Sequence, residues 1–471
     1  MIFKQFVLES LGHASYLVGD EKTGRALVLD PRRDVDVYFE AARAKGLRIT
    51  HAVDTHGHND YLSGLQELKL RQDIEILGYD DAPIRYDHRP VKDGETIEMG
   101  DVIFEIAHTP GHTPEHISLL VFDETAGDEP ALMLSGGALL VGDLARPDLL
   151  GGPESARRAA TEFCHTIQER ILWRLADHIE VFPTHVAGSL CGGNIGSRLS
   201  TTVGYERKTN AILARVSSSE EFVEECIRLD NLPAVPPYWR RMRRQNLDGP
   251  PALGLLQEPP PLQAEEVERE LQNGAVVLDT RSPEAFAGGH IPGSLNVGLG
   301  TAFPTWAGTV LQPTDRVVLV LDGPTELWDV VWHLLRIGYD PPLGWLAGGM
   351  GSWRGAAKPL ESLGIVTVDE LRARVEARDM DVLDVRQPAE WAAGHIDGAR
   401  FVTGAEIPDR ADELMSGRPL AVVCGSGFRS SVAASYLRSR GRRDVVSVAG
   451  GMSAWTSAGY PKVVEEGEST G

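Results

Sequence analysis

The chain has 471 residues, a length typical of about three domains. Its 46 Lys and Arg residues and 68 Asp and Glu residues give a formal net charge of −22, and a surface this acidic repels phosphate backbones and anionic lipid. We therefore expect no nucleic acid and no membrane among its partners.

The spacing of the cysteines and the sequence of the N-terminus indicate the cellular compartment of the protein. The four cysteines are scattered without a CxxC pair, which does not indicate a disulfide framework. The N-terminus has no basic segment followed by a long apolar run, and no stretch approaches the roughly 18 apolar residues of a transmembrane helix. These features predict a cytoplasmic protein without a signal peptide.

Residues 1–231 alternate short apolar runs with helical patterns, which is typical of an α/β domain. Strands are predicted at residues 25–30, 49–54, 102–107, 117–122 and 180–183. Helices are predicted at residues 35–44, 61–70 and 156–176.

Histidines and acids follow several of these predicted strands. They are His56, His58 and Asp60 in DTHGHNDY, His112 in TPGH, Asp143 in VGD and His185 in FPTH. Alternate side chains of an extended segment face one way, so those of the first motif can converge. A lone histidine is usually an ordinary polar residue, but three motifs of this kind in this order favour a metal site.

Residues 232–261 are rich in Pro and Arg. Proline is excluded from helix interiors and central strands, so we expect an extended linker between domains. The arginines at positions 240, 241, 243 and 244 could bind an anion, but salt bridges at a solvated or interdomain surface are the preferred interpretation.

The rest of the chain is duplicated, as residues 262–357 and 363–466. LDTRSPEAFAGGHIPGSLNV begins at Leu278, and LDVRQPAEWAAGHIDGARFV begins at Leu383, an offset of 105 positions. After a three-residue length change, GGM and a tryptophan recur at an offset of 102. Units of about 100 residues are large enough to fold alone, so this is a domain duplication.

The second copy carries a Gly-rich cysteine loop between a predicted strand and a helix. The loop reads Cys424, Gly425, Ser426, Gly427, Phe428 and Arg429. Backbone N–H groups and the helix N-terminus favour an anion there, so we expect a thiolate that can carry sulfur as a persulfide, with Arg429 holding an anionic donor such as thiosulfate. A buried structural cysteine is the alternative.

These residues resemble the rhodanese (thiosulfate sulfurtransferase) family. In the first copy, Asp322 stands at the cysteine position and Leu327 at the arginine position. The resemblance therefore implies a catalytically silent first copy that serves as a spacer or docking surface. His290 and His395 recur in both copies, which indicates a structural role.

The first domain resembles the metallo-β-lactamase superfamily, and within it the persulfide dioxygenase branch fused to rhodanese domains. HASYLVGDEKTGRALVLDP, GDLARPDL, THVAGSLCGG and TTVGYERKTN carry this resemblance with the histidine motifs. It implies an αββα sandwich followed by two three-layer α/β domains. It also implies one Fe(II) per chain, with Zn as the alternative, held by His56 and His112.

The same resemblance makes His58, Asp60, Asp143 and His185 groups that orient the ligands or substrate, or alternative metal ligands. The family's third ligand is an aspartate six residues before Asp143, where this chain has Gly137. Water could fill the gap, Asp143 could reach in, or the centre could be lost. Tyr61 stands where binuclear hydrolases have a histidine, which argues against a second metal ion.

We therefore hypothesise a sulfide-metabolising enzyme. O2 would oxidise a thiol persulfide of the glutathione or coenzyme A type to sulfite, and Cys424 would pass sulfane sulfur between thiosulfate and a thiol. The alternatives are a sulfurtransferase with a degenerate metal site, a thioester metallohydrolase, and a sulfur-relay module that docks partners. We also expect a homo-oligomer.

Overall fold

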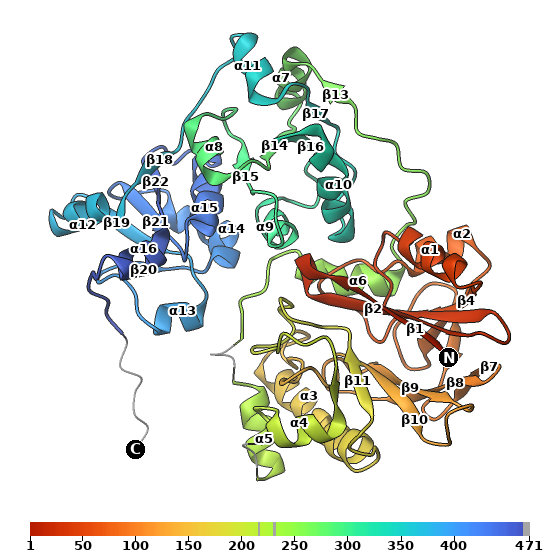
Figure 1. Ribbon diagram of the computed structural model, residues 1–471. Coiled ribbons are helices and arrows are strands. Elements are labelled where there is room, and N and C mark those ends of the chain that lie inside the picture. The colour runs from red at the N-terminus through yellow and green to blue at the C-terminus, as the bar shows by residue number, and fades with distance from the viewer. Residues whose placement is uncertain (215–216, 229–231, 465–471) are drawn as a thin grey trace. The chain divides into compact units, whose positions relative to one another are not determined.

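The computed structural model describes residues 1–214, 217–228 and 232–464. Contacts divide the chain into two compact units (Figure 1). The first contains residues 1–233 and 239–256, and the second contains residues 234–238 and those from 257 onward.

The first unit contains two six-stranded sheets. The strands of one sheet, in spatial order, are β1 (Ile2–Leu8), β2 (His13–Asp20), β3 (Arg25–Leu29), β4 (Arg48–Val53), β5 (Glu75–Tyr79) and β6 (Arg89–Val91). Those of the other are β12 (Thr201–Thr202), β11 (Glu180–Pro183), β10 (Pro130–Gly136), β9 (Ile117–Asp123), β8 (Val102–His108) and β7 (Thr96–Met99). Apolar side chains of both sheets form one shared core.

Helices cover the outer faces of the two sheets. Because side chains alternate along a strand, Leu27 and Leu29 enter the shared core while Ala26 and Val28 face the opposite side. That side is covered by α1 (Asp36–Ala44) and α2 (Leu65–Arg71). The other sheet is covered by α3 (Pro153–His165), a π-helical segment (Thr166–Leu172) and α5 (Ser219–Cys226), and α4 (Val203–Thr209) follows β12. The predicted αββα sandwich is confirmed.

Two predicted helices have different limits in the structure. The helix predicted at 61–70 begins only at Leu65, because Ser63 instead forms an isolated β-bridge with Arg32. The helix predicted at 156–176 begins earlier, at Pro153, and changes to π-helical hydrogen bonding from Thr166 to Leu172.

The expectation of an extended linker is wrong for its central part, which forms helix α6 (Trp239–Asp248) and belongs to the first unit. Prolines flank this helix and none lies inside it. Trp239, Met242, Asn246 and Leu247 are buried at helical spacing, so one face packs on the first unit. The preferred salt-bridging interpretation fits Arg243, whose Nη2 lies 2.6 Å from Oε2 of Glu115.

The second unit contains two five-stranded sheets with the same strand order, and all their ladders are parallel. The strands of the first copy are β13 (Pro261–Leu262), β17 (Gly344–Leu346), β16 (Val317–Val320), β14 (Val276–Asp279) and β15 (Leu295–Asn296). Those of the second copy are β18 (Gly364–Val366), β22 (Val445–Val448), β21 (Leu420–Val423), β19 (Asp381–Asp384) and β20 (Arg400–Phe401). Parallel neighbours require crossover helices.

The crossover helices occur in corresponding places of the two copies. The first copy has α7 (Ala264–Gln272), α8 (Pro283–Gly288), α9 (Phe303–Val310), α10 (Leu327–Arg336) and α11 (Gly349–Gly355). The second has α12 (Val368–Glu376), α13 (Pro388–Ala392), α14 (Ile407–Arg410), α15 (Phe428–Ser439) and α16 (Gly451–Ser457). The two rhodanese-like α/β domains are therefore confirmed.

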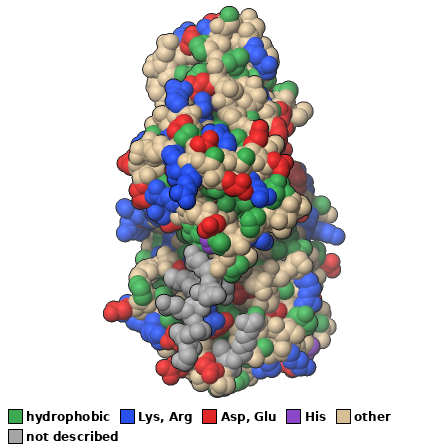
Figure 2. Space-filling model, turned by 90° about the vertical axis from the view of Figure 1, so that its left-hand side faces the viewer, with side chains coloured by type: hydrophobic (Ala, Val, Ile, Leu, Met, Phe, Trp, Pro, Cys, Tyr) green, Lys and Arg blue, Asp and Glu red, His purple; other side chains and the backbone are tan. Residues whose placement is uncertain are grey.

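The structure also shows how charged side chains are distributed on one face of the molecule and how long the helices are. Acidic and basic side chains are interspersed on the face shown in Figure 2. Within the described ranges, every helix is too short or too polar to span a bilayer.

Candidate metal pocket and cysteine loop

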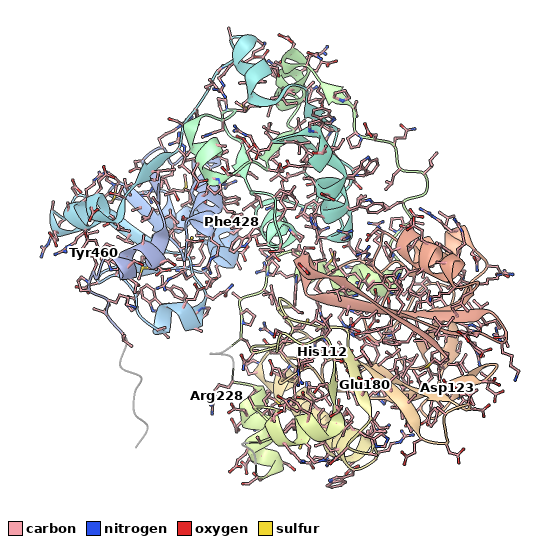
Figure 3. All side chains as sticks on the ribbon, viewed as in Figure 1. His112, Asp123, Glu180, Arg228, Phe428 and Tyr460 are labelled. Atoms are coloured by element: carbon pink, nitrogen blue, oxygen red, sulfur yellow. The ribbon has the colours of Figure 1, made fainter. Side chains whose placement is uncertain are left out.

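Five buried histidines lie together where strands of the first unit end. His56 and His58 follow β4, His112 and His116 lie between β8 and β9, and His185 follows β11. Figure 3 shows His112 in this unit. One ring nitrogen from each of three of them, His56, His112 and His185, lies within 4.8 Å of the other two. The fold thus brings together side chains from three distant sequence motifs.

Each of these three rings is held by a contact to Nδ1. Nδ1 of His56 lies 2.9 Å from the hydroxyl of the preceding threonine, and Nδ1 of His112 lies 2.9 Å from the backbone oxygen of Arg146. Nδ1 of His185 lies 3.5 Å from Oδ2 of Asp60. The Nε2 atoms of His56 and His185 approach each other to 3.4 Å.

These imidazoles are suited to hold a metal ion. Burial, together with the neighbouring His185, lowers the pKa of His112 to about 3, so the ring is neutral, as a metal ligand must be. Burial also lowers the pKa of His56 well below its ordinary value. Nε2 of His112 is buried and has no hydrogen-bond partner among the described residues. A buried lone pair of this kind fits a ligand to a metal ion.

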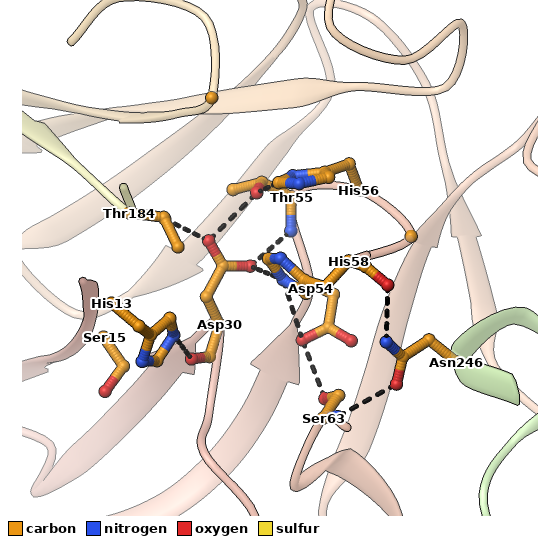
Figure 4. A network of polar contacts seen from close by, with 12 residues as sticks. His13, Ser15, Asp30, Asp54, Thr55, His56, His58, Ser63, Thr184 and Asn246 are labelled. Carbon is orange, nitrogen blue, oxygen red and sulfur yellow. Dashed lines mark hydrogen bonds and ion pairs between the residues drawn. The ribbon is translucent and has the colours of Figure 1, made fainter. Parts of the chain in front are cut away.

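Asp30 organises the opposite side of the pocket, with His58 as its partner (Figure 4). Its carboxylate accepts hydrogen bonds from the backbone N–H of Thr55 at 2.6 Å and from the Thr55 hydroxyl at 2.9 Å. Nε2 of His58 lies 3.0 Å from the same carboxylate, and the hydroxyl of Thr184 also donates to it. These contacts hold Asp30 at a φ of 51°, a left-handed conformation that non-glycine residues seldom adopt.

Asp60 and Cys191 lie beside His185 on the side away from His56. Potential ligand atoms of Asp60, His185 and Cys191 lie within 4.8 Å of one another. Burial alone would raise the pKa of Asp60, but the hydrogen bond and the charge of His185 lower it to about 2. Asp60 is therefore a buried carboxylate directed at the Nδ1 side of His185.

Gly137 offers no ligand, and its surroundings leave little space for a side chain. Its backbone N–H donates a hydrogen bond to Nε2 of His116 at 2.8 Å. A Cβ atom at this position would lie 2.7 Å from Cδ2 of His112 and 3.4 Å from Cδ2 of His185. The two imidazole rings thus occupy the space that an aspartate side chain would enter.

Two other predicted residues have different surroundings. Asp143 accepts hydrogen bonds from the backbone N–H groups of Asn194 at 2.7 Å and Leu144 at 2.9 Å, so its carboxylate orders the loop after Cys191. It belongs to none of the candidate metal groups found in the described part of the chain. The Tyr61 hydroxyl donates to the backbone oxygen of Asp30 at 3.2 Å.

The six loop residues of the second copy connect β21 to α15. Sγ of Cys424 accepts a hydrogen bond from the backbone N–H of Gly427 at 3.1 Å and lies 3.6 Å from the Ser430 hydroxyl. Cys424 is only 1% exposed, whereas Ser426 at the centre of the loop is exposed. Figure 3 shows the position of Phe428 at the start of α15. The sulfur therefore lies under a solvent-facing loop, at the N-terminus of a helix.

A second glycine motif closes this loop from behind. Gly451 has a φ of 53°, and a Cβ atom there would lie 2.2 Å from the backbone oxygen of Cys424. That oxygen accepts a hydrogen bond from the backbone N–H of Met452 at 2.7 Å. Only glycine lets α16 approach the loop so closely.

Arg429 is already paired in this structure. Its two terminal nitrogens contact the two carboxylate oxygens of Glu390 at 2.6 and 2.7 Å. Although burial opposes it, Glu390 and Cys424 together raise the pKa of Arg429. The guanidinium thus interacts with the thiol, but an anionic donor would have to compete with a carboxylate that the sequence analysis did not identify.

The corresponding loop of the first copy has none of these features. Asp322 is exposed, and its backbone N–H contacts Glu326 at 3.2 Å, while Leu327 is buried. His290 and His395 stack on Phe286 and Trp391 in the same way in the two copies, with ring centroids 3.8 and 3.4 Å apart. Because the same stacking contact occurs in both copies, it supports a structural role for these two histidines.

Several residues around the two sites were missed in the sequence. His116 lies four positions after His112 in one motif, so its proximity could have been inferred. Glu390 has a weaker signal, because Ala285 occupies its place in the silent copy. Asp30 ends a predicted strand, but nothing in the sequence indicates that it meets His58.

Comparisons with known proteins agree with this architecture. The rhodanese-like domain family matches residues 263–356 and 367–458, and the metallo-beta-lactamase superfamily matches residues 9–126. The persulfide dioxygenase ETHE1, mitochondrial, of Bos taurus is 29% identical over 227 residues, which are 46% of this chain and 77% of that protein. The thiosulfate sulfurtransferase GlpE of Pseudoalteromonas translucida is 34% identical over 98 residues, 21% of this chain and 93% of that protein.

A solved structure covers parts of both units. The crystal structure of a metallo-beta-lactamase from Staphylococcus aureus is 31% identical, with a TM-score of 0.65, and the match covers 74% of this chain and 98% of that one. The chain therefore belongs to the metallo-β-lactamase superfamily through its first unit and to the rhodanese family through its second, as a fusion of one metallo-β-lactamase-type domain with two rhodanese-like domains.

Proposed function

We propose that this chain is an enzyme of sulfur metabolism that transfers sulfane sulfur through Cys424 and oxidises a low-molecular-weight thiol persulfide in its first domain. The similarity to a persulfide dioxygenase and to a thiosulfate sulfurtransferase supports the two activities in the two parts of the chain. The persulfide would be of the glutathione or coenzyme A type.

The observation that carries the proposal is the setting of the Cys424 sulfur. Sγ accepts the backbone N–H of Gly427 at 3.1 Å at the start of a 12-residue helix, where a negative charge is stabilised. The thiolate attacks the outer sulfur of thiosulfate, the S–S bond of the donor breaks, and sulfite leaves with that bond's electron pair. The product is a Cys424 persulfide anion, which the same N–H group stabilises.

The second half of the reaction regenerates the Cys424 thiolate from its persulfide. An acceptor thiolate attacks the outer sulfur of the Cys424 persulfide and leaves as a persulfide, while the electron pair of the broken bond restores the Cys424 thiolate. Arg429 can stabilise the incoming dianion once Glu390 releases its guanidinium. The Ser430 hydroxyl lies 3.6 Å from Sγ and can donate a hydrogen bond to the sulfur when the sulfur is negatively charged.

In the first domain, His56 and His112 would hold the metal ion. Iron in such a site supplies binding and activation of O2. The overall change converts a persulfide, O2 and water into a thiol, sulfite and two protons, so the sulfane sulfur is oxidised and O2 is reduced. The residues of this chain supply neutral imidazoles, the Asp30–His58 pair that orders the pocket wall, and a buried setting that excludes bulk water.

The alternative function is sulfur transfer alone, with a first domain that has lost its oxidation chemistry. Gly137 favours it, because this position supplies no carboxylate and the ring of His112 occupies the adjacent space. The two proposals differ in O2 consumption and agree on Cys424.

Both can be tested on the full chain loaded with Fe(II). We expect O2 uptake with glutathione persulfide and thiocyanate formation from thiosulfate and cyanide. Cys424→Ser should abolish the second activity, while Cys226→Ala, which alters a buried cysteine of the first unit, should retain it. Transfer that survives in Cys424→Ser would refute the sulfur site. Transfer without O2 uptake would leave only the alternative function.

A further inference from the structure

The hydrogen bonds around His56, His112 and His185 determine which nitrogen of each ring carries the proton. The Thr55 hydroxyl donates to Asp30, so its oxygen accepts from Nδ1 of His56. Nδ1 of His112 faces a backbone oxygen, which can only accept. Both rings therefore carry their proton on Nδ1 and present an unprotonated Nε2.

His185 has the same arrangement. Its Nδ1 faces the Asp60 carboxylate at 3.5 Å and lies 3.4 Å from the Ser189 hydroxyl, which already accepts a hydrogen bond from the backbone N–H of Cys191. The acceptor character of Asp60 places the proton of a neutral His185 on Nδ1. Although burial opposes it, Cys191 and Asp60 raise the pKa of His185 well above its ordinary value, so a metal ion that binds Nε2 must displace the proton there.

One ring nitrogen of each of the three histidines thus lies within 4.8 Å of the other two in a buried space. The Nε2 atoms of His56 and His185 are 3.4 Å apart, so a protonated His185 can donate to His56 when no metal ion is bound. Two nitrogens bound to one ion at about 2.1 Å, with an angle of roughly 90 to 110° at the ion, are separated by about 3.0 to 3.4 Å. The observed distance is that of two ligands to one cation.

We propose that His185 is the third ligand of the metal ion, so that the site of this chain is a three-nitrogen set of His56, His112 and His185. Asp60 supplies its negative charge indirectly, through Nδ1 of His185, in a carboxylate–histidine–metal arrangement. This inference rests on the proposed function of the first domain, which needs a bound metal.

The surroundings of Gly137 agree with this assignment. A Cβ atom at position 137 would lie 2.7 Å from the His112 ring and 3.4 Å from the His185 ring. The absence of a side chain there lets both rings approach the centre. The carboxylate that a residue at position 137 would have provided is replaced by Asp60, on the far side of His185.

A second candidate group of metal ligands also contains His185 and lies on the Nδ1 side of its ring. Asp60, His185 and Cys191 also place potential ligand atoms within 4.8 Å of one another. Cobalt separates the two sets, because a thiolate ligand produces an intense charge-transfer band in the ultraviolet and a site of imidazoles alone does not.

The test is a Co(II) titration of the full chain, followed by absorption spectroscopy and metal analysis. We expect one Co(II) per chain, visible ligand-field bands and no thiolate band. His185→Ala should weaken Co(II) binding by more than about 100-fold, and Asp60→Asn by about 10- to 100-fold at unchanged stoichiometry, as found for partners behind a metal ligand. Two control variants should bind Co(II) normally. They are Cys191→Ser and His178→Ala, which alters an exposed histidine whose Nε2 lies 3.3 Å from Oε2 of Glu129.

His185→Gln and circular dichroism of each variant control for misfolding, and sulfur transfer at Cys424 reports that the second unit is intact. A thiolate band that disappears in Cys191→Ser would overturn the proposal in favour of the second group. Unchanged affinity in both His185 variants would also overturn it. Since Co(II) binding is measured without turnover, a protein that binds Co(II) through His185 but consumes no O2 would refute the oxidation and retain the three-nitrogen site.

Discussion

Asn296 joins the first rhodanese-like domain to the helix that follows Cys424. Its buried side chain donates to the backbone oxygens of Asp279 at 3.1 Å and Arg281 at 3.0 Å, and accepts from the Ser431 hydroxyl at 2.7 Å. Asn296→Ala removes three hydrogen bonds and leaves buried polar groups unpaired, at about 1 kcal/mol each. Only the bond with Ser431 reaches α15, so we expect a loss of about 1 kcal/mol in the free energy that holds α15 against the first copy.

The assay is the rate at which Cys424 is alkylated, followed by mass spectrometry of the full chain. Because Cys424 is 1% exposed, alkylation requires local opening of the loop. A loss of about 1 kcal/mol should raise the rate about 5-fold, and Ser431→Ala, which removes the same bond from its other end, should raise it by about the same factor. Asn273→Ala, at an exposed position of the same domain, is the matched control. An unchanged alkylation rate in Asn296→Ala would refute the idea that the silent domain supports the cysteine loop.

Three further substitutions test other contacts. Glu390→Gln should lower the KM for thiosulfate severalfold at nearly unchanged kcat, because the Arg429 guanidinium loses a competing carboxylate; a higher KM would show that Glu390 instead holds the arginine in place. Gly451→Ala should lower both the transfer activity and the Tm, since its Cβ would lie 2.2 Å from a backbone oxygen at a φ of 53°; a fully active variant would contradict this. Arg243→Met should cost the first unit about 2 kcal/mol in urea unfolding by breaking a 2.6 Å pair with the buried Glu115, whereas an unchanged midpoint would mean that α6 docks without it.

The sequence was sufficient wherever a pattern repeats or a period is regular. The offsets of 105 and 102 located Cys424 at a strand end and identified Asp322 as its counterpart in the first copy, and both residues lie close to the end of a strand in the structure. The strand at Glu180–Pro183 has the predicted limits because a short apolar run ends at a proline.

The sequence was insufficient to predict features that depend on long-range contacts or on the orientation of side chains. The flanking prolines predicted an extended segment where the structure has helix α6, although Trp239 and Met242 are three positions apart, as buried residues of a helix are. Asp30 meets His58 and Thr184 only after β3, β4 and β11 are assembled. Composition indicates that a histidine is present, but its hydrogen bonds decide which nitrogen faces the centre.

The two copies of the rhodanese-like domain separate structural from functional residues within a single chain. The ion pairs Asp279–Arg281 and Asp384–Arg386 are nearly identical, at 2.6 and 2.7 Å, so they serve the fold in the silent and the cysteine-bearing copy alike.

The residues near the sulfur instead differ between the two copies. Leu327 replaces Arg429 and Ala285 replaces Glu390, and each charge of such a partly buried pair would be uncompensated without the other. Because the first copy keeps the residues of the fold and has neither member of this pair, its fold does not depend on an Arg–Glu pair at these positions.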